Sequence, residues 1–90
     1  IVNPYIVVEV LSKSTRKFDL NEKMDYYKRI PSLQYMLFVD QTRPWATVYA
    51  RTTRPDEWLN HDYRTLESVV NLGDVVLPLQ EIYRKVTFEQ

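Results

Sequence analysis

The stretch YIVVEVLS, residues 5–12, is the part of the sequence that decides the fold class. Seven of its eight residues suit a β-strand that is covered on both faces, whereas Glu9 places a carboxylate at its centre. Strict alternation puts Glu9 on the same face as Val7 and Leu11. A buried carboxylate without a partner costs several kcal/mol, so we expect Glu9 to be paired with a cation, bound to a metal ion or protonated.

Length and composition restrict the choice of protein class. Ninety residues provide one small domain. Twelve Lys and Arg residues balance twelve Asp and Glu residues, which argues against a general nucleic-acid coat protein but leaves room for an enzyme with a local DNA-binding patch. The chain has no cysteine, so it forms neither disulfides nor thiolate metal sites. No apolar run is long enough for a bilayer and no signal peptide is evident, so we expect a cytoplasmic protein without a membrane partner.

The segment DLNEKMDYYKRI, residues 19–30, has helical spacing. Asp19, followed three residues later by Glu22, has the form of a capping box, and Pro31 is expected to end the helix. Ser14 or Thr15 would start it earlier. One amphipathic stripe consists of Leu20, Met24, Tyr27 and Ile30.

The remaining elements are predicted to be mostly strands. LQYMLFVD (33–40) follows the helix and forms a βαβ-like unit with the strand at 5–12, for which a parallel, right-handed crossover is usual. WATVYAR (45–51) alternates as a half-exposed antiparallel strand does. Further predictions are a short strand at 57–64, a turn at Gly73, an extended piece at 75–79 and a short closing helix from Leu79 to Tyr83.

These elements predict an α+β domain with an α/β core. It consists of a mixed β-sheet with one helix packed on it, followed by an antiparallel C-terminal extension. No linker divides residues 1–90, so we expect a single domain. A strand covered on both faces needs neighbours on both edges. Its position so early in the sequence indicates that the N-terminal part of a larger domain is lacking.

Lys23 is the first candidate partner of Glu9. It lies about 60° around the helix axis from Leu20, at the edge of the face that packs on the sheet. The helix of a βαβ unit returns over the sheet, so the Lys23 ammonium is expected to reach Glu9. A divalent metal ion is the alternative partner, with Asp40 as a possible second carboxylate. A salt-bridged structural acid, or an acid at a sheet edge, is the other interpretation of Glu9.

Other polar and aromatic residues give weaker signals. Lys13, Arg16 and Lys17 form a basic cluster that suits either a solvated loop or phosphate contact. His61 is the single histidine, so a surface or packing role is expected rather than metal binding. The aromatic residues expected to pack on the sheet, rather than to stack on bases, are Trp45, Tyr49 and Trp58.

The stretches NPYIVVEVLSKST (3–15) and DLNEKMDYYKRIPSLQ (19–34) resemble the Uma2 family of restriction endonucleases, within the PD-(D/E)XK nuclease superfamily. The family pattern is an apolar strand with E-V-L-S, then S-T, an Asp, a Lys four residues on and a Tyr four further. LPLQEIY (77–83) also resembles the family, so the likeness covers nearly the whole chain. The matching positions are Glu9 to Ser12, Ser14, Thr15, Asp19, Lys23 and Tyr27.

The resemblance implies a DNA endonuclease that uses Mg²⁺ or Mn²⁺ on a restriction-endonuclease-like sheet. Glu9 would be the catalytic metal ligand and Lys23 the catalytic ammonium. The superfamily lysine usually lies two residues after the acid, where this chain has Leu11, so the ammonium would come from the helix instead. The second metal ligand of the superfamily is an Asp on an upstream strand. The remaining implied roles are support by Ser12, Asp19 and Tyr27, and DNA contact by Lys13, Arg16 and Lys17.

A second hypothesis comes from a different functional class. The chain would then be a non-catalytic or truncated interaction module that keeps the fold and forms a homo-oligomer through exposed strand edges. Only the nuclease requires Glu9 and Lys23 to converge with a second carboxylate. The sequence leaves both hypotheses open.

Overall fold

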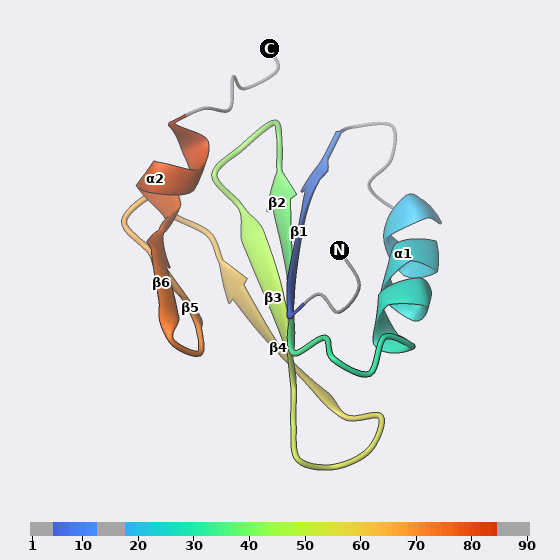
Figure 1. Ribbon diagram of the computed structural model, residues 1–90. Helices are drawn as coiled ribbons and strands as arrows, with labels where there is room; N and C mark the ends of the chain where they lie inside the picture. The colour runs from blue at the N-terminus through green and yellow to red at the C-terminus, as the bar shows by residue number, and fades with distance from the viewer. Residues whose placement is uncertain (1–4, 13–17, 85–90) are drawn as a thin grey trace.

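The computed structural model describes residues 5–12 and 18–84. They form a four-stranded sheet in the order β1-β2-β3-β4, a two-stranded sheet of β5 and β6, and two helices (Figure 1). This is the α+β fold with a mixed sheet that the sequence predicts, and it is compatible with a restriction-endonuclease-like domain. The elements are β1 (Ile6–Leu11), α1 (Phe18–Lys28), β2 (Tyr35–Asp40), β3 (Ala46–Arg51), β4 (Trp58–Tyr63), β5 (Val69–Leu72), β6 (Val75–Pro78) and α2 (Leu79–Tyr83).

The unit β1-α1-β2 has the predicted parallel pairing, with Glu9 opposite Phe38. The antiparallel pairing of β3 with β2 and with β4 is also as expected. α1 covers one side of the sheet, which we call the helix face. Beneath it lie the fully buried side chains of Leu33, Met36 and Phe38. The predicted helical stripe packs against them through Leu20, Met24, Tyr27 and Ile30.

The start of α1 differs from the expectation. Among the described residues α1 begins at Phe18, so Asp19 lies within the helix rather than at its cap, and the earlier start at Ser14 or Thr15 lies outside the described residues. The helix ends at Lys28, just before Pro31.

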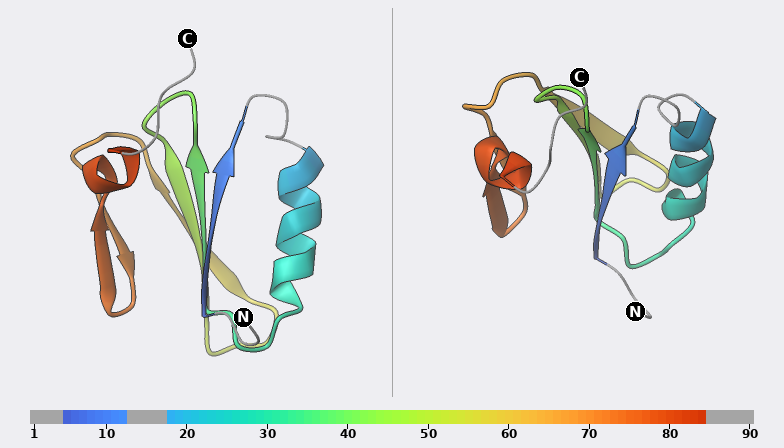
Figure 2. Two further views of the ribbon diagram at one scale, coloured as in Figure 1. Left: turned by 45° about the horizontal axis from the view of Figure 1, so that its top comes forward. Right: turned by 90° about the horizontal axis from the view of Figure 1, so that it is seen from above.

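The opposite side of the sheet, which we call the closed face, packs on the hairpin β5–β6 and on α2 (Figure 2). β5 was not predicted as a strand; the sequence indicated only the turn at Gly73 and the extended piece that became β6. Gly73 has a φ of 67°, a conformation that glycine adopts without strain and that a tight hairpin turn requires. The core of this face consists of Leu37, Val39, Ala46, Val48, Val70, Leu72, Leu79 and Tyr83.

The prediction that β1 is covered on both faces is wrong for the described residues. Ile6 packs on the closed-face core, but Val8 is 52% exposed and Val10 is 49% exposed. β1 is also an edge of the four-stranded sheet. The physical reason is that β5–β6 and α2 pack on β2 and β3, and within the described residues they reach only the start of β1. Neither helix in this part of the chain has the length and apolarity needed for a membrane span.

Candidate functional site

Glu9 projects from the centre of β1 toward α1, where two side chains hold its carboxylate. The Lys23 Nζ atom lies 3.0 Å from Glu9 Oε2, in a hydrogen-bonded ion pair. The Tyr27 hydroxyl donates to Glu9 Oε1. Lys23 and Tyr27 are four residues apart, so they lie on one flank of α1, one turn from each other. Both oxygens of the carboxylate therefore have a donor.

The environment keeps Glu9 ionised although it is largely covered. Its side chain is 23% exposed, and this burial alone raises the pKa of the carboxyl. The hydrogen bonds from Tyr27 and Lys23, together with the Lys23 charge, outweigh the burial and hold the pKa below its ordinary value. Burial and the bond to Glu9 raise the pKa of Tyr27 to about 12. At neutral pH the group therefore consists of a carboxylate, an ammonium and a neutral phenol.

This group borders open space on α1. A cleft of about 380 Å³ is lined by Lys23 and Tyr27 together with their neighbours Glu22 and Tyr26. Tyr26 is 59% exposed, and its ring meets the edge of the Tyr27 ring with centroids 5.7 Å apart. A solvent-borne group can thus approach the donors that hold Glu9.

Asp40 is the second carboxylate on the helix face of the central strands. It lies on β2 opposite Leu11, two residues further along the strand direction than the Glu9–Phe38 pair, and it is 8% exposed. Its Oδ1 atom accepts hydrogen bonds from the Thr42 backbone N (2.7 Å) and hydroxyl (2.6 Å), and its Oδ2 atom lies 3.6 Å from Arg43 Nε. Asp40 therefore stabilises the β2–β3 turn, the common role of an Asp at the end of a strand.

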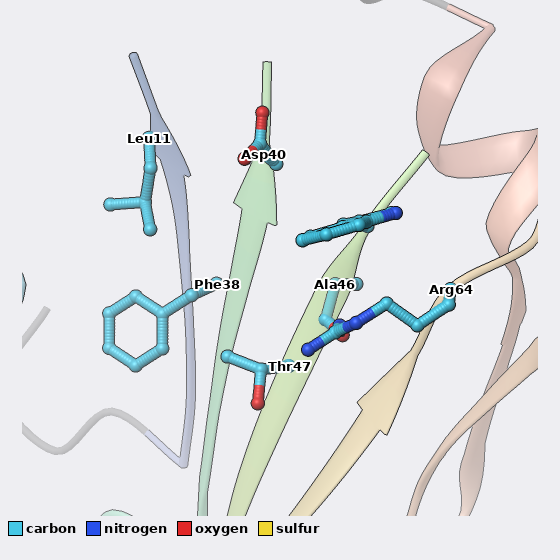
Figure 3. Close-up of a pocket in the computed structure, with 7 residues that line it drawn as sticks. Leu11, Phe38, Asp40, Ala46, Thr47 and Arg64 are labelled. Carbon is cyan, nitrogen blue, oxygen red and sulfur yellow. The ribbon is translucent and has the colours of Figure 1, made fainter. Parts of the chain in front are cut away.

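A second polar group lies where β3 begins and β4 ends. The Arg43 guanidinium stacks on the Trp45 ring at 3.5 Å from its centroid, and the Arg64 guanidinium lies 4.6 Å from the same centroid. Figure 3 shows the pocket beside Arg64. Its volume is about 110 Å³. Trp45 thus contacts two arginines and lies outside the cluster beneath α1, whereas Tyr49 and Trp58 pack on the helix face as expected. The pocket is lined by Leu11, Phe38, Asp40, Trp45, Ala46, Thr47 and Arg64.

The other residues predicted for the site have different outcomes. Ser12 directly follows β1 and is partly buried. Asp19 lies in α1, but its side chain is outside the described part of the structure. His61 is exposed, with its ring centroid 4.5 Å from that of Tyr63. The basic cluster of Lys13, Arg16 and Lys17 lies outside the described residues.

Sequence reasoning missed the direct bond from Tyr27 to Glu9 and the two arginines at Trp45. The spacing of Lys23 and Tyr27 already contained the first signal, because residues four apart share a helix flank. The second had no local signal, since Arg43 and Arg64 are 21 positions apart in the sequence and meet only through the pairing of β3 with β4.

The described residues fit part of a divalent metal site. Mg²⁺ needs oxygen ligands from one or two carboxylates and keeps several waters. Glu9 supplies one carboxylate, with its oxygens held by Tyr27 and Lys23, whereas Asp40 is engaged by Thr42 and Arg43. Across residues 5–12 and 18–84 no three Asp, Glu or His side chains gather in an arrangement that could hold a metal ion. Glu9 is therefore one ligand of an incomplete set.

Comparison with known proteins gives a family match over most of the chain. The model of the Uma2 family, described as "Putative restriction endonuclease", matches residues 1–85. The chain is also 46% identical over 41 residues to a protein of Synechocystis sp. called "Uncharacterized protein sll1609". That match spans 46% of this chain and 23% of the relative. No solved structure matches the chain.

Proposed function

The chain belongs to the Uma2 family, and from this premise we propose that it contributes the Glu9–Lys23 half of a metal-dependent DNA endonuclease centre. The reaction would be hydrolysis of a phosphodiester bond. Magnesium is the proposed cation and manganese its substitute. The rest of the centre, including a second carboxylate, would come from outside the residues that the structure describes.

The observation that carries the proposal is the Glu9 side chain at the centre of β1, held by Lys23 and Tyr27. A carboxylate at this position costs free energy unless it is compensated, and a hydrophobic residue there would pack without that cost. The chain instead provides two donors from the same helix flank, with Lys23 Nζ at 3.0 Å. A carboxylate next to an ammonium, beside an open cleft, is an arrangement suited to phosphodiester chemistry.

Each side chain of the group has a proposed task. Glu9 would hold the cation, which lowers the pKa of a bound water and neutralises charge on the phosphate. Lys23 is 42% exposed and would place its ammonium against a phosphate oxygen as negative charge develops there. Tyr27 would orient the Glu9 carboxylate. With a pKa of about 12 its phenol stays protonated and continues to donate.

Calorimetry with Mn²⁺, followed by a plasmid-nicking assay, tests the proposal. The wild-type chain is compared with Glu9→Gln, which keeps the shape of the side chain but removes its charge, and with Lys23→Met. Asp25→Asn is the matched control, because Asp25 is an exposed acid of the same helix that does not line the cleft. We expect Glu9→Gln to abolish Mn²⁺ binding and nicking, and Lys23→Met to reduce nicking at least about 100-fold while Mn²⁺ still binds.

The outcomes separate catalysis from contamination. Nicking that persists in Glu9→Gln would come from another nuclease and would overturn the proposal. Absence of both Mn²⁺ binding and nicking in a well-folded wild-type chain would also overturn it for this chain acting alone. A longer family member is then added, in which the glutamate that matches Glu9 is replaced by glutamine. Nicking by the mixture would show that a second chain completes the centre.

A non-catalytic module that forms a homo-oligomer is the second candidate, and the β1 strand favours it. Val8 and Val10 expose an apolar strip, and β1 is an edge strand of the described sheet. Edge strands with apolar side chains readily pair with another chain. Sedimentation of wild type against Val8→Lys distinguishes the candidates: a dimer lost in the variant, with no Mn²⁺ binding in either, supports the module.

A further inference from the structure

The helix face continues beyond α1 as a polar surface that the proposed centre does not use. Strand register places four residues in one row across this face, and Glu9 and Asp62 are its ends. Three strand spacings separate β1 from β4, or about 14 Å. The cluster beneath α1 includes Tyr49 and Trp58, whereas Thr47 and Trp45 lie outside it. The row consists of Glu9, Phe38, Thr47 and Asp62.

Two arginines converge on Trp45 on this surface. Arg43 stacks at 3.5 Å from the ring centroid, and its Nε atom lies 3.6 Å from Asp40. Within the described part of the chain, no hydrogen-bond partner is found for the Arg43 Nη atoms, and the side chain is 44% exposed. Arg64 pairs with Asp62 at 3.2 Å and is 45% exposed. Arg43 therefore has donors available to a ligand, while Asp62 holds Arg64 in place beside it.

The turn that carries Arg43 and Trp45 is held from the closed face. The Tyr83 hydroxyl reaches three backbone carbonyls of this turn: those of Asp40, of Arg43 at 2.8 Å and of Trp45 at 2.9 Å. Tyr83 is 6% exposed and belongs to the closed-face core. A guanidinium stacked on a ring, on a turn fixed by a buried hydroxyl, loses little conformational entropy when it binds.

We propose that Arg43 and Arg64, stacked on Trp45, bind the phosphodiester backbone of DNA on the same face as Glu9. The inference rests on the proposed function, which assigns DNA to that face. A planar guanidinium matches the geometry of phosphate oxygens with two donors, and its stack on an aromatic ring keeps it oriented. Asp62, the partner of Arg64, lies about 14 Å from Glu9 along this row, which is close to the width of the DNA major groove, about 12 Å, so one duplex would contact Glu9 and Arg64 together.

Fluorescence anisotropy with a labelled 20-bp duplex in EDTA measures binding without cleavage. The double variant Arg43→Gln/Arg64→Gln is compared with wild type and with Arg54→Gln. Arg54 is the matched control because it is an exposed arginine of the β3–β4 loop, at the other end of β3. We expect the double variant to bind at least about tenfold more weakly, with a salt dependence shallower by about two phosphate contacts, and Arg54→Gln to bind as wild type.

An independent readout uses Trp45 itself. The chain has two tryptophans, and Trp58→Phe leaves Trp45 as the single one. Duplex DNA is then expected to change the Trp45 emission, and the Arg43→Gln/Arg64→Gln variant to lose most of that change. Circular dichroism of every variant shows whether the fold is kept.

The result that overturns the inference is distinct from the one that overturns the proposed function. Equal duplex binding by wild type and a folded double variant, with unchanged salt dependence, overturns the inference while Glu9-dependent nicking stands. Wild-type protein that binds no duplex at low salt also overturns it. Binding that depends on the arginines, in a protein whose nicking does not depend on Glu9, supports the inference and refutes only the nuclease.

Discussion

The two faces of the four-stranded sheet differ in what covers them. On the closed face Leu37, Val39 and Val70 have no exposed surface, and the hairpin β5–β6 and α2 supply the cover. On the helix face α1 covers one part and holds the Glu9 group at its flank, and the Arg43–Trp45–Arg64 group lies outside the cluster beneath the helix. Both faces bury apolar area, with Leu33, Met36 and Phe38 beneath α1, but the helix face also arranges charged groups at its margins.

This difference places the candidate chemistry on one side only of the same strands. Alternation along β2 sends Leu37 and Val39 to one side and Phe38 and Asp40 to the other. A substitution at one position therefore acts on one face alone, unless a side chain links the two. Tyr83 is such a link, because it belongs to the closed-face core and bonds the turn of Arg43.

Leu37→Ala is expected to have the largest effect on stability. Leu37 is fully buried in the closed-face core, so the substitution removes apolar contacts and leaves a cavity. We expect a loss of about 2–5 kcal/mol in the free energy of unfolding, measured by urea denaturation. A loss below about 1 kcal/mol would show that the closed-face core contributes less stability than its burial implies.

Tyr83→Phe is expected to come next, because it removes the link between the faces while keeping the ring. The carbonyls of Asp40, Arg43 and Trp45 lose a buried donor, at a cost of about 1–3 kcal/mol. Amide hydrogen exchange is expected to accelerate in residues 40–45 more than in β5–β6. Uniform acceleration would contradict the local role of the hydroxyl.

The unfolding free energy at alkaline pH provides a second test of the role of Tyr83. Burial and the Asp40 charge raise the pKa of Tyr83 from 10.0 to about 12. Between these values the unfolded chain releases the proton and the folded chain keeps it, so the stabilisation present below pH 10 is lost as pH rises through 12. We expect the fall in unfolding free energy over this range to be shallower in Tyr83→Phe. The raised pKa of Tyr27 on the helix face also makes the unfolding free energy fall as pH rises, and this contribution remains in the Tyr83→Phe variant.

Glu9→Gln is expected to change stability less than either core substitution. The ion pair is partly exposed, so its loss should cost about 1 kcal/mol or less at neutral pH. The pKa of Glu9 is lowered from 4.5, so its contribution is present above that value and is lost as pH falls through the lowered pKa. Urea denaturation of wild type and Glu9→Gln at pH 7 and in acid tests this prediction. The difference between their unfolding free energies should vanish in acid. A difference that grows in acid would contradict the ion pair.

Leu59→Ala provides the smallest expected effect. Leu59 lies in the edge strand β4 and is 64% exposed, so its truncation is expected to cost less than about 0.5 kcal/mol. It serves as the matched control for Leu37→Ala, because the same atoms are deleted outside the core. A cost similar to that of Leu37→Ala would indicate that β4 is covered in solution, for example by a second copy.

The sequence predicted the elements whose periodicity is strong. The stripe from Leu20 to Ile30 identified α1 and its packing face, and alternation identified β3. β5 was missed because four residues before a glycine turn contain too little alternation to distinguish a strand from a loop. The exposure of Val8 and Val10 could not be predicted either, since an apolar run does not reveal which covering elements are present.

The candidate site was predictable only in part. Glu9 and Lys23 were connected by a geometric argument, because a crossover helix returns over its own strand. The positions of Arg43 and Arg64 depend on the register of β3 with β4, and that of Tyr83 on packing across 43 residues. Such contacts follow from tertiary structure and leave no pattern in the local sequence. The function of the Glu9 group stays a prediction.

The bond from Tyr83 to the β2–β3 turn also affects the order in which the protein assembles during synthesis. The ribosome releases residues 40–45 well before Tyr83, which lies 43 positions after Asp40. Until α2 emerges, the turn lacks the hydroxyl that fixes its carbonyls, and the arginines near Trp45 are not yet held in place. The proposed DNA-contacting surface is therefore fixed only when nearly the whole described chain has been made.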